Sequence, residues 1–192
     1  MATQDLTEAQ RERRLRILAA AEALAVEGGW DGVQMREVAT RADVALGTLY
    51  RYFPSKEHLL LSVMLDQVNA LAERLAVRPP EGDDPVERVV DVLRRANRAL
   101  QREPQVTVAM IRALVSGNHD VAPVVAAIRD VMRRIIADAL GPARVHGHDA
   151  RDVLAIDVLS DVWLAALVSW IGGAEPATVV ERLEAATRML FG

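Results

Sequence analysis

The chain has no cysteine and few aromatic residues. Its 192 residues include three Trp, two Tyr and two Phe. The absence of Cys excludes both a disulfide framework and thiolate chemistry. The sequence begins with a polar segment and lacks the apolar region of a secretory signal peptide, so we expect a cytoplasmic protein. Because 51% of the residues are apolar, the chain can bury one large core or two modest ones.

The chain also lacks an excess of basic residues. Its formal charge is -4, and residues 1–60 contain eight Lys and Arg against nine Asp and Glu. Binding to nucleic acid depends on where charge is placed, so a DNA-binding function would have to rest on a local patch.

The fold class predicted from the hydrophobic pattern is all-α. Apolar residues recur at spacings of three and four, strand-like alternation is absent, and Pro or Gly separates the segments. The expected helices span residues 7–27, 33–40, 45–53, 55–77, 85–102, 104–116, 121–140, 148–171 and 176–190.

The first helix has clear signals at both ends. Thr7 and Gln10 have the spacing of a capping box, and Gly28 and Gly29 can end the helix. The face expected inside comprises Leu15, Leu18, Ala19, Leu24 and Ala25. Trp30 is expected to close a small core with Leu18, Val38 and Phe53. Of the arginines in the first half, Arg14 and Arg16 are expected to be solvated, whereas Arg11 or Arg13 could contact phosphate.

Residues 33–60 have the pattern of a helix-turn-helix. A short helix, a four-residue interruption containing Asp43, and a second short helix follow one another, and Asp tolerates left-handed backbone better than most residues. The residues expected to pack inward are Met35, Val38, Ala39, Leu49 and Phe53. Pro54 ends the second helix and Ser55 is placed to cap the next one.

The outer surface of the second helix carries hydroxyl and guanidinium donors. It presents Leu46, Gly47, Thr48, Tyr50, Arg51 and Tyr52, with no acidic residue between Asp43 and Glu57. Such donors suit phosphates and base edges, and a glycine allows close backbone approach to a groove. The alternative is a small helical hairpin whose tyrosines pack against a neighbour.

The run from Gly47 to Lys56, GTLYRYFPSK, resembles the recognition helix of the TetR family of bacterial transcriptional repressors. The resemblance extends from Arg11 to about Leu65, and the run RADVALGTLYRYFPSKEHLL is also similar to the steroid-catabolism regulators of the KstR type. The chain departs from the family pattern at both helix caps, where Gln34 and Ala45 stand in place of Ser or Thr. A missing cap costs ~1 kcal/mol, so both helices should depend more on tertiary packing.

The resemblance implies a DNA-binding domain over residues 1–54 and a ligand-binding and dimerisation domain over residues 55–192. It implies that Tyr50, Tyr52 and Lys56 contact phosphate, that Thr48 faces the groove, and that Arg36 reaches a base. The predicted DNA-binding residues are Arg36, Leu46, Gly47, Thr48, Tyr50, Arg51, Tyr52 and Lys56. The expected partner is a palindromic double-stranded operator.

Residues 153–171 have nearly the length and the apolar character of a membrane-spanning helix. Asp157 and Asp161 lie one turn apart within them, and a mid-span Asp is costly, so a helix buried between protein surfaces is preferred over a membrane span. The resemblance implies that the last two helices form a homodimer, and Leu159 and Leu167 are expected in that interface.

The second domain is also expected to bind an apolar small-molecule effector with one polar or anionic end. Its candidate pocket residues are Met110, Leu114, Met132, Trp163, Leu167 and Trp170, since Met and aromatic residues form adaptable apolar surfaces. Arg112 and Asn118 could orient the polar end. The similarity to steroid-catabolism regulators suggests a sterol-derived acyl thioester, and a fatty acid, a terpenoid or a drug-like aromatic compound also fits. Helix 55–77 is expected to be the one element touching both domains.

Catalysis finds little support in the sequence. The cluster His146-Gly147-His148-Asp149 lacks a third ligand at metal-site spacing, and nothing converges on the pair Asp157 and Asp161. No cofactor and no enzymatic activity are predicted. The main hypothesis is a ligand-responsive, homodimeric repressor. The alternatives are an all-helical ligand carrier or scaffold without DNA binding, and a small helical hydrolase.

Overall fold

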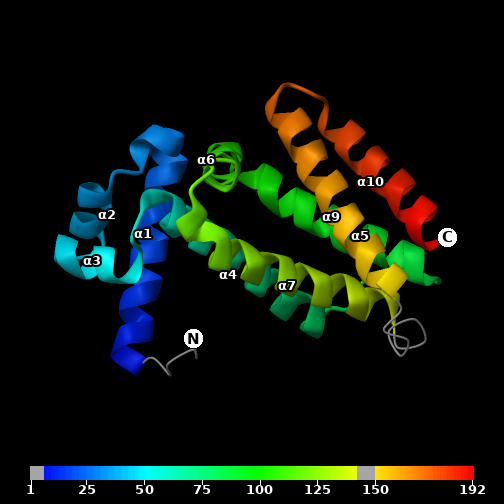
Figure 1. Cartoon of the computed structure of the whole chain (residues 1–192), viewed down its shortest axis with the longest axis horizontal. Helices are drawn as coiled ribbons and strands as arrows, with labels where there is room; N and C mark the ends of the chain where they lie inside the picture. The colour runs from blue at the N-terminus through cyan, green and yellow to red at the C-terminus, as the bar shows by residue number, and fades with distance from the viewer. Residues whose placement is uncertain (1–6, 142–149) are drawn as a thin grey trace. The chain divides into compact units, whose positions relative to one another are not determined.

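A computed structural model describes residues 7–141 and 150–192, and every regular element in these ranges is helical. The elements in order are α1 (Glu8–Gly32), α2 (Met35–Arg41), α3 (Leu46–Tyr52), α4 (Lys56–Val77), α5 (Pro85–Arg102), α6 (Pro104–Leu114), η1 (His119–Val121), α7 (Ala122–Leu140), α9 (Ala150–Ile171) and α10 (Pro176–Phe191). Figure 1 shows their course. The predicted all-α class is confirmed.

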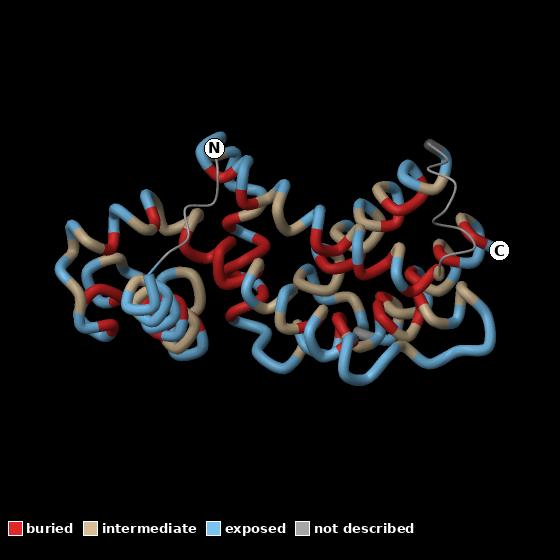
Figure 2. The backbone as a smooth tube through the Cα atoms, turned by 90° about the horizontal axis from the view of Figure 1, so that it is seen from below, coloured by how far each residue is buried: buried red, intermediate tan, exposed pale blue. Residues whose placement is uncertain are grey.

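The chain divides into two compact units. The N-terminal unit comprises residues 1–66 and 103–125, and the C-terminal unit comprises residues 67–102 and 126–192. Helix α4 therefore contributes its first half to one unit and its second half to the other. In both units buried positions recur along the helices at intervals, as expected for amphipathic packing (Figure 2).

Helix α1 confirms the predicted start and end signals. The Thr7 hydroxyl accepts from the Gln10 amide, and the Gln10 side chain accepts from the Thr7 amide, which is the reciprocal capping box. Gly28 and Gly29 interrupt the helical geometry, with Gly29 at φ 57°, and one further helical turn follows them. A left-handed residue of this kind is tolerated best by glycine.

The predicted inner face of α1 is partly wrong. Leu18, Leu24 and Ala25 are buried, but Leu15 is 53% exposed and Ala19 is also exposed. The residues that complete the buried face are Ile17, Ala20 and Ala21. The helix has apolar residues on more than one side, and its neighbours α2 and α6 select which side is covered.

Helix α6 packs extensively on α1 within the N-terminal unit. The expectation that α4 is the one element connecting residues 1–54 to the rest is therefore wrong. Helix α6 lies beyond residue 55 and reaches the first helix directly, because its buried residues Val106, Ala109 and Met110 need an apolar partner.

In the C-terminal unit, α9 and α10 lie side by side and α10 also packs on α5 (Figure 1). Helix α7 is joined to α9 by two ion pairs. Arg133 Nε lies 2.8 Å from Asp157 Oδ1, and Arg129 Nη2 lies 3.4 Å from Asp161 Oδ1. The pairing with Asp157, first through its hydrogen bond, raises the pKa of Arg133. The two aspartates thus have structural partners.

Candidate nucleic-acid interface and ligand-binding residues

Helices α2 and α3 form the predicted helix-turn-helix. Asp43 occupies the turn at φ 53°, the left-handed backbone expected for it. The amide of Val44 donates to the carbonyl of Ala39 at 3.0 Å and closes the turn. Val38, Ala39, Leu49 and Phe53 are buried as predicted, whereas Met35 is only half-buried. Burial of Leu49 and Phe53 fixes which side of α3 faces solvent.

The N-caps of α2 and α3 lack side-chain hydrogen bonds, as the sequence predicts. Neither Gln34 nor Ala45 makes a side-chain capping bond, although both have the extended backbone of an N-cap. Ser55, by contrast, accepts from the amide of His58 at 3.1 Å and caps α4. Phe53 packs inside the motif. Its ring lies beside those of Tyr52 and His58, and the Arg14 guanidinium lies 5.8 Å from its ring centroid. Arg14 is therefore less solvated than predicted.

Most of the predicted DNA-binding residues lie on the outer side of the motif. Arg36, Gly47, Tyr50 and Arg51 are exposed. The half-buried members of the set are Leu46, Thr48, Tyr52 and Lys56. A Cβ added at Gly47 would meet nothing within 4 Å, so no internal contact demands a glycine there.

Lys56 has an unexpected neighbour in Trp30. Its Nζ lies 4.3 Å from the Trp30 ring centroid, and the Arg112 guanidinium carbon of α6 lies 4.8 Å from the same centroid. Burial, with the Arg112 charge as a further cause, lowers the pKa of Lys56. Trp30 is half-buried between two cations and does not close the apolar core as predicted. Sequence spacing could not reveal this stack, because its three members come from distant segments.

His58 is a half-buried residue at the start of α4 whose Nδ1 is buried. Its Nδ1 has no hydrogen-bond partner among the described residues. Burial, together with the nearby charge of Arg14, lowers the pKa of His58. Both causes disfavour the protonated imidazole relative to an exposed histidine.

The six candidate ligand residues are divided between the two units. Met110 and Leu114 lie in the N-terminal unit, and Met132, Trp163, Leu167 and Trp170 lie in the C-terminal unit. Met110, Met132 and Leu167 are buried, and the other three are half-buried.

The two polar residues suggested for the ligand's headgroup have other partners. Arg112 stacks on Trp30, and Asn118 accepts from the Asp120 amide at 3.0 Å to cap η1. These contacts leave N–H donors of Arg112 directed away from the ring, so the expectation that the two residues orient a ligand stays a prediction.

Three buried polar atoms of the C-terminal unit lack hydrogen-bond partners in the part of the chain that the structure describes. They are Asn97 Oδ1, Gln101 Nε2 and Trp163 Nε1. Leaving such a group unpaired costs ~1–3 kcal/mol, so each calls for a partner such as a ligand or water. Sequence analysis missed Asn97 and Gln101. The signal was available, because both continue the apolar stripe of α5 that contains Val90 and Leu93.

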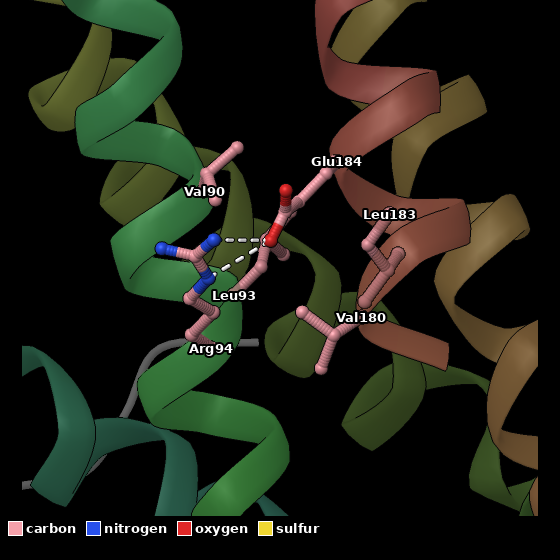
Figure 3. Close-up of a pocket in the computed structure, with 6 residues that line it drawn as sticks. All are labelled: Val90, Leu93, Arg94, Val180, Leu183 and Glu184. Carbon is pink, nitrogen blue, oxygen red and sulfur yellow. Dashed lines mark hydrogen bonds and ion pairs between the residues drawn. The ribbon is translucent and has the colours of Figure 1, made fainter. Parts of the chain in front are cut away.

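A small void between α5 and α10 is not a ligand site. It is lined by Val90, Leu93, Arg94, Val180, Leu183 and Glu184, and it is too small for a water molecule. Figure 3 shows Arg94 of α5 reaching Glu184 of α10, with Nε donating to Oε1 at 2.9 Å. This pair joins the two helices. No metal-binding group of three or more ligands occurs among the described residues, and His146, His148 and Asp149 lie outside them.

Comparisons with known proteins agree with this architecture. Residues 17–63 match the family described as bacterial regulatory proteins, tetR family, and residues 82–190 match the tetracyclin repressor-like C-terminal domain. The transcriptional repressor KstR of Rhodococcus jostii is 44% identical over 96% of this chain and 85% of its own length. KstR of Mycobacterium tuberculosis is 44% identical over 97% of this chain and 84% of its own length.

Two solved structures are similar over nearly the whole chain. A TetR transcriptional regulator from Rhodococcus sp. RHA1 has a TM-score of 0.88 at 35% identity, covering 96% of this chain and 98% of that one. FadR from Thermus thermophilus, a TetR family repressor in complex with lauroyl-CoA, has a TM-score of 0.73 at 27% identity, covering 92% of each chain. The exposed recognition helix, the helical C-terminal unit and these matches together show that the chain is a transcriptional regulator belonging to the TetR family of bacterial regulatory proteins.

Proposed function

We propose that this regulator is a repressor that binds a palindromic operator as a homodimer and releases it when an apolar effector with an anionic end binds. The observation that carries the DNA-binding part is the outer side of α3. It exposes Gly47, Tyr50 and Arg51, beside Arg36 of α2, in a segment without acidic residues between Asp43 and Glu57. Residues 1–54 would provide DNA contacts and residues 55–192 would provide dimerisation and ligand binding.

Each predicted DNA contact has a distinct role. Tyr50, Tyr52 and Lys56 would position the motif on phosphates, whereas Arg36 would read a base edge in the major groove. Leu46, Thr48 and Arg51 would line the groove, and Gly47 would allow the α3 backbone to approach it. A dimer presenting two such helices roughly 34–36 Å apart, or a multiple of that, requires an inverted repeat.

The dimer interface is proposed on α9, but on a face different from the one expected. Leu159 is 0% exposed and Leu167 is also buried, so both point into their own unit. The large apolar residues that α9 leaves exposed are Val153, Leu154, Val158 and Val168, and the last three, spaced four and ten residues apart, lie on one side of the helix. This stripe needs a partner, and a second copy of α9 would supply one.

The same exposed stripe explains the membrane-like composition of α9. Residues Arg151–Ile171 are long and apolar enough to cross a membrane, with only 28% of the apolar window buried. The ion pairs of Asp157 and Asp161 with α7 favour a helix packed between protein surfaces. We therefore propose a cytoplasmic protein without a membrane partner. Membership of a family of transcriptional regulators supports the further proposal that it is not an enzyme.

The proposed effector is an acyl thioester of coenzyme A whose acyl part is a sterol-derived or fatty chain. The KstR repressors are 44% identical, and the FadR relative at 27% identity holds lauroyl-CoA. Trp163 supports the proposal, because its buried Nε1 has no partner among residues 7–141 and 150–192 and could donate to a ligand oxygen. Met132, Leu167 and Trp170 of the same unit would contact the apolar chain, and Met110 and Leu114 remain candidates in the other unit.

Selection of duplexes from a random pool by the full-length protein tests the DNA-binding part. We expect an inverted repeat, bound more weakly as salt is raised because phosphate contacts release counterions. Failure to retain any duplex would favour the alternative of a ligand carrier or scaffold.

Titration of the selected operator complex with lauroyl-CoA, a sterol-derived acyl-CoA and the matching free acids tests the effector. A ~100-fold release requires ~2.7 kcal/mol of coupling between the two sites. Tight binding of a thioester with unchanged operator affinity would refute the sensing part alone.

The interface can be tested independently by replacing Val158 with Arg. We expect this variant to sediment as a monomer and to lose operator affinity, because a charge would be buried at the centre of the stripe. Val115→Arg is the control, since Val115 is also an exposed valine, at 62% against 39% for Val158, but lies after α6. A Val158→Arg variant that remains dimeric would exclude this face of α9.

A further inference from the structure

The C-terminal unit contains an open groove between the second half of α4 and helix α5. Its volume is about 940 Å³. That is at the upper end of the ~300–1,000 Å³ typical of small-molecule sites. It is lined by Ala70, Leu71, Glu73, Arg74, Leu75, Val77, Arg78, Glu81, Asp91, Arg95, Arg98, Ala99 and Arg102. None of the residues assigned above to DNA, dimer or effector belongs to it.

The groove has an excess of positive charge. Five arginines face three acidic residues. Two of these acids form ion pairs with two of the arginines. Glu81 lies 3.1 Å from Arg78 and 3.6 Å from Arg95, and Asp91 lies 2.6 Å from Arg95 alone. In the described ranges, the remaining arginines, Arg74, Arg98 and Arg102, have no carboxylate within 4.0 Å.

One wall of the groove is held in place by polar contacts. Arg95, whose side chain is only 17% exposed, donates to the carbonyls of Arg78 at 2.9 Å and Pro79 at 3.3 Å. The Glu81 amide donates to Asp91 Oδ2 at 3.0 Å. Gly82 follows at φ 150°, where a Cβ would lie 2.6 Å from that of Glu87. The loop after α4 is therefore fixed against α5.

Three exposed guanidinium groups line one groove, and their like charges repel each other. Solvation alone does not explain why the three groups lie together, whereas a bound anion would offset the repulsion. Arg98 and Arg102 are one turn apart on α5, and Arg74 belongs to the facing helix α4. Buried Leu71 and Leu75 add an apolar floor beneath them. Guanidinium groups bind phosphate oxygens in bidentate fashion, and an apolar floor accepts a flat ring.

We propose that this groove is a binding site for a small phosphate-rich anion of the nucleotide class, held by Arg74, Arg98 and Arg102. Two sources share this chemistry: the nucleotide end of coenzyme A and a free nucleoside polyphosphate. A nucleic-acid strand fits less well, because Glu73, Glu81 and Asp91 would repel an extended chain of phosphates along the groove. With coenzyme A as its source the site rests on the proposed function and deepens it, whereas a free nucleotide bound there requires neither operator binding nor release.

Isothermal titration of the full-length protein with coenzyme A, ADP and pyrophosphate, each at 50 and 200 mM NaCl, tests the site directly. We expect all three to bind, more weakly at higher salt. Tighter binding of coenzyme A than of ADP would identify the coenzyme as the source, and the reverse order would identify a free nucleotide. Absence of binding by all three compounds would overturn the proposal.

The matched variants are Arg98→Gln with Arg102→Gln, and Arg134→Gln as the control. Arg134 is exposed on α7 in the same unit but outside the groove. We expect the double variant to bind ~10–100-fold more weakly, as the loss of charge-assisted hydrogen bonds predicts, and the control to bind normally. Both should melt like the wild type, because the replaced side chains are exposed.

Equal nucleotide affinity in the double variant and the wild type would refute the site. The proposal would also fail if the double variant lost affinity for random duplex DNA while keeping its nucleotide affinity, because the groove would then serve DNA. Operator release is not measured in these titrations, so failure of the groove and failure of the proposed effector are distinguishable.

Discussion

Lys56 provides a quantitative test of how the DNA-binding surface is built. The resemblance to TetR repressors predicts that Lys56 contacts a phosphate, and the structure places its Nζ 4.3 Å from the Trp30 ring centroid. We expect both interactions to operate, because an ammonium group on the face of an indole still has donors directed away from the ring. Replacing Lys56 by Met keeps the aliphatic stem and removes the charge.

The effects on stability and on DNA binding have separate magnitudes. Loss of the cation–π contact should lower the free energy of unfolding by ~0.5–2 kcal/mol. Loss of one phosphate contact in each protomer of a dimer should reduce the slope of log affinity against log salt by ~1.8. Between 50 and 200 mM salt, the wild type should thus lose ~12-fold more operator affinity than the variant.

Arg112→Met is the matched control for Lys56→Met. Arg112 lies 4.8 Å from the same ring centroid but belongs to α6, so its loss should reduce stability without changing the salt slope. Urea unfolding and fluorescence anisotropy with the selected operator measure the two quantities. A Lys56→Met variant that keeps the wild-type salt slope would show that Trp30 alone holds this lysine and that it contacts no phosphate.

Three further variants test other parts of the argument. Gly47→Ala should stabilise the fold by ~0.5–1 kcal/mol in urea unfolding, because a Cβ meets nothing there and Ala favours a helix. The same variant should bind the operator more weakly, and an unchanged operator affinity in fluorescence anisotropy would exclude close approach of the α3 backbone to DNA. Arg36→Ala should flatten the preference among operator variants by ~1–3 kcal/mol in competition binding, and a uniform loss would make Arg36 a phosphate contact. Burial lowers the pKa of His58 from 6.5, so the unfolded chain binds the proton first and stability should fall as pH drops below about 6.5. Urea unfolding of His58→Leu between pH 5 and 7.5 should show a weaker dependence on pH, and an identical pH dependence would contradict this cause.

The sequence by itself determined the features that depend on neighbours within about four residues. The capping box of Thr7 and Gln10, the left-handed Asp43 and the absence of caps at Gln34 and Ala45 were all predicted correctly. Several helix boundaries followed for the same reason, such as those of α5 at Pro85 and Arg102, whereas α1 continues past its predicted end to Gly32. Each signal concerns the backbone groups of one turn, whose hydrogen bonds a local residue either satisfies or leaves open.

Only the tertiary structure decided which face of each helix is covered. Leu15 and Leu159 are both apolar residues on apolar helices, yet Leu15 is exposed and Leu159 is completely buried. The position of Trp30 between Lys56 and Arg112 likewise depends on α6 packing against α1. A helix with apolar residues on several sides can bury more than one of them. The helix that packs against it, here a segment distant in sequence, decides which side is covered.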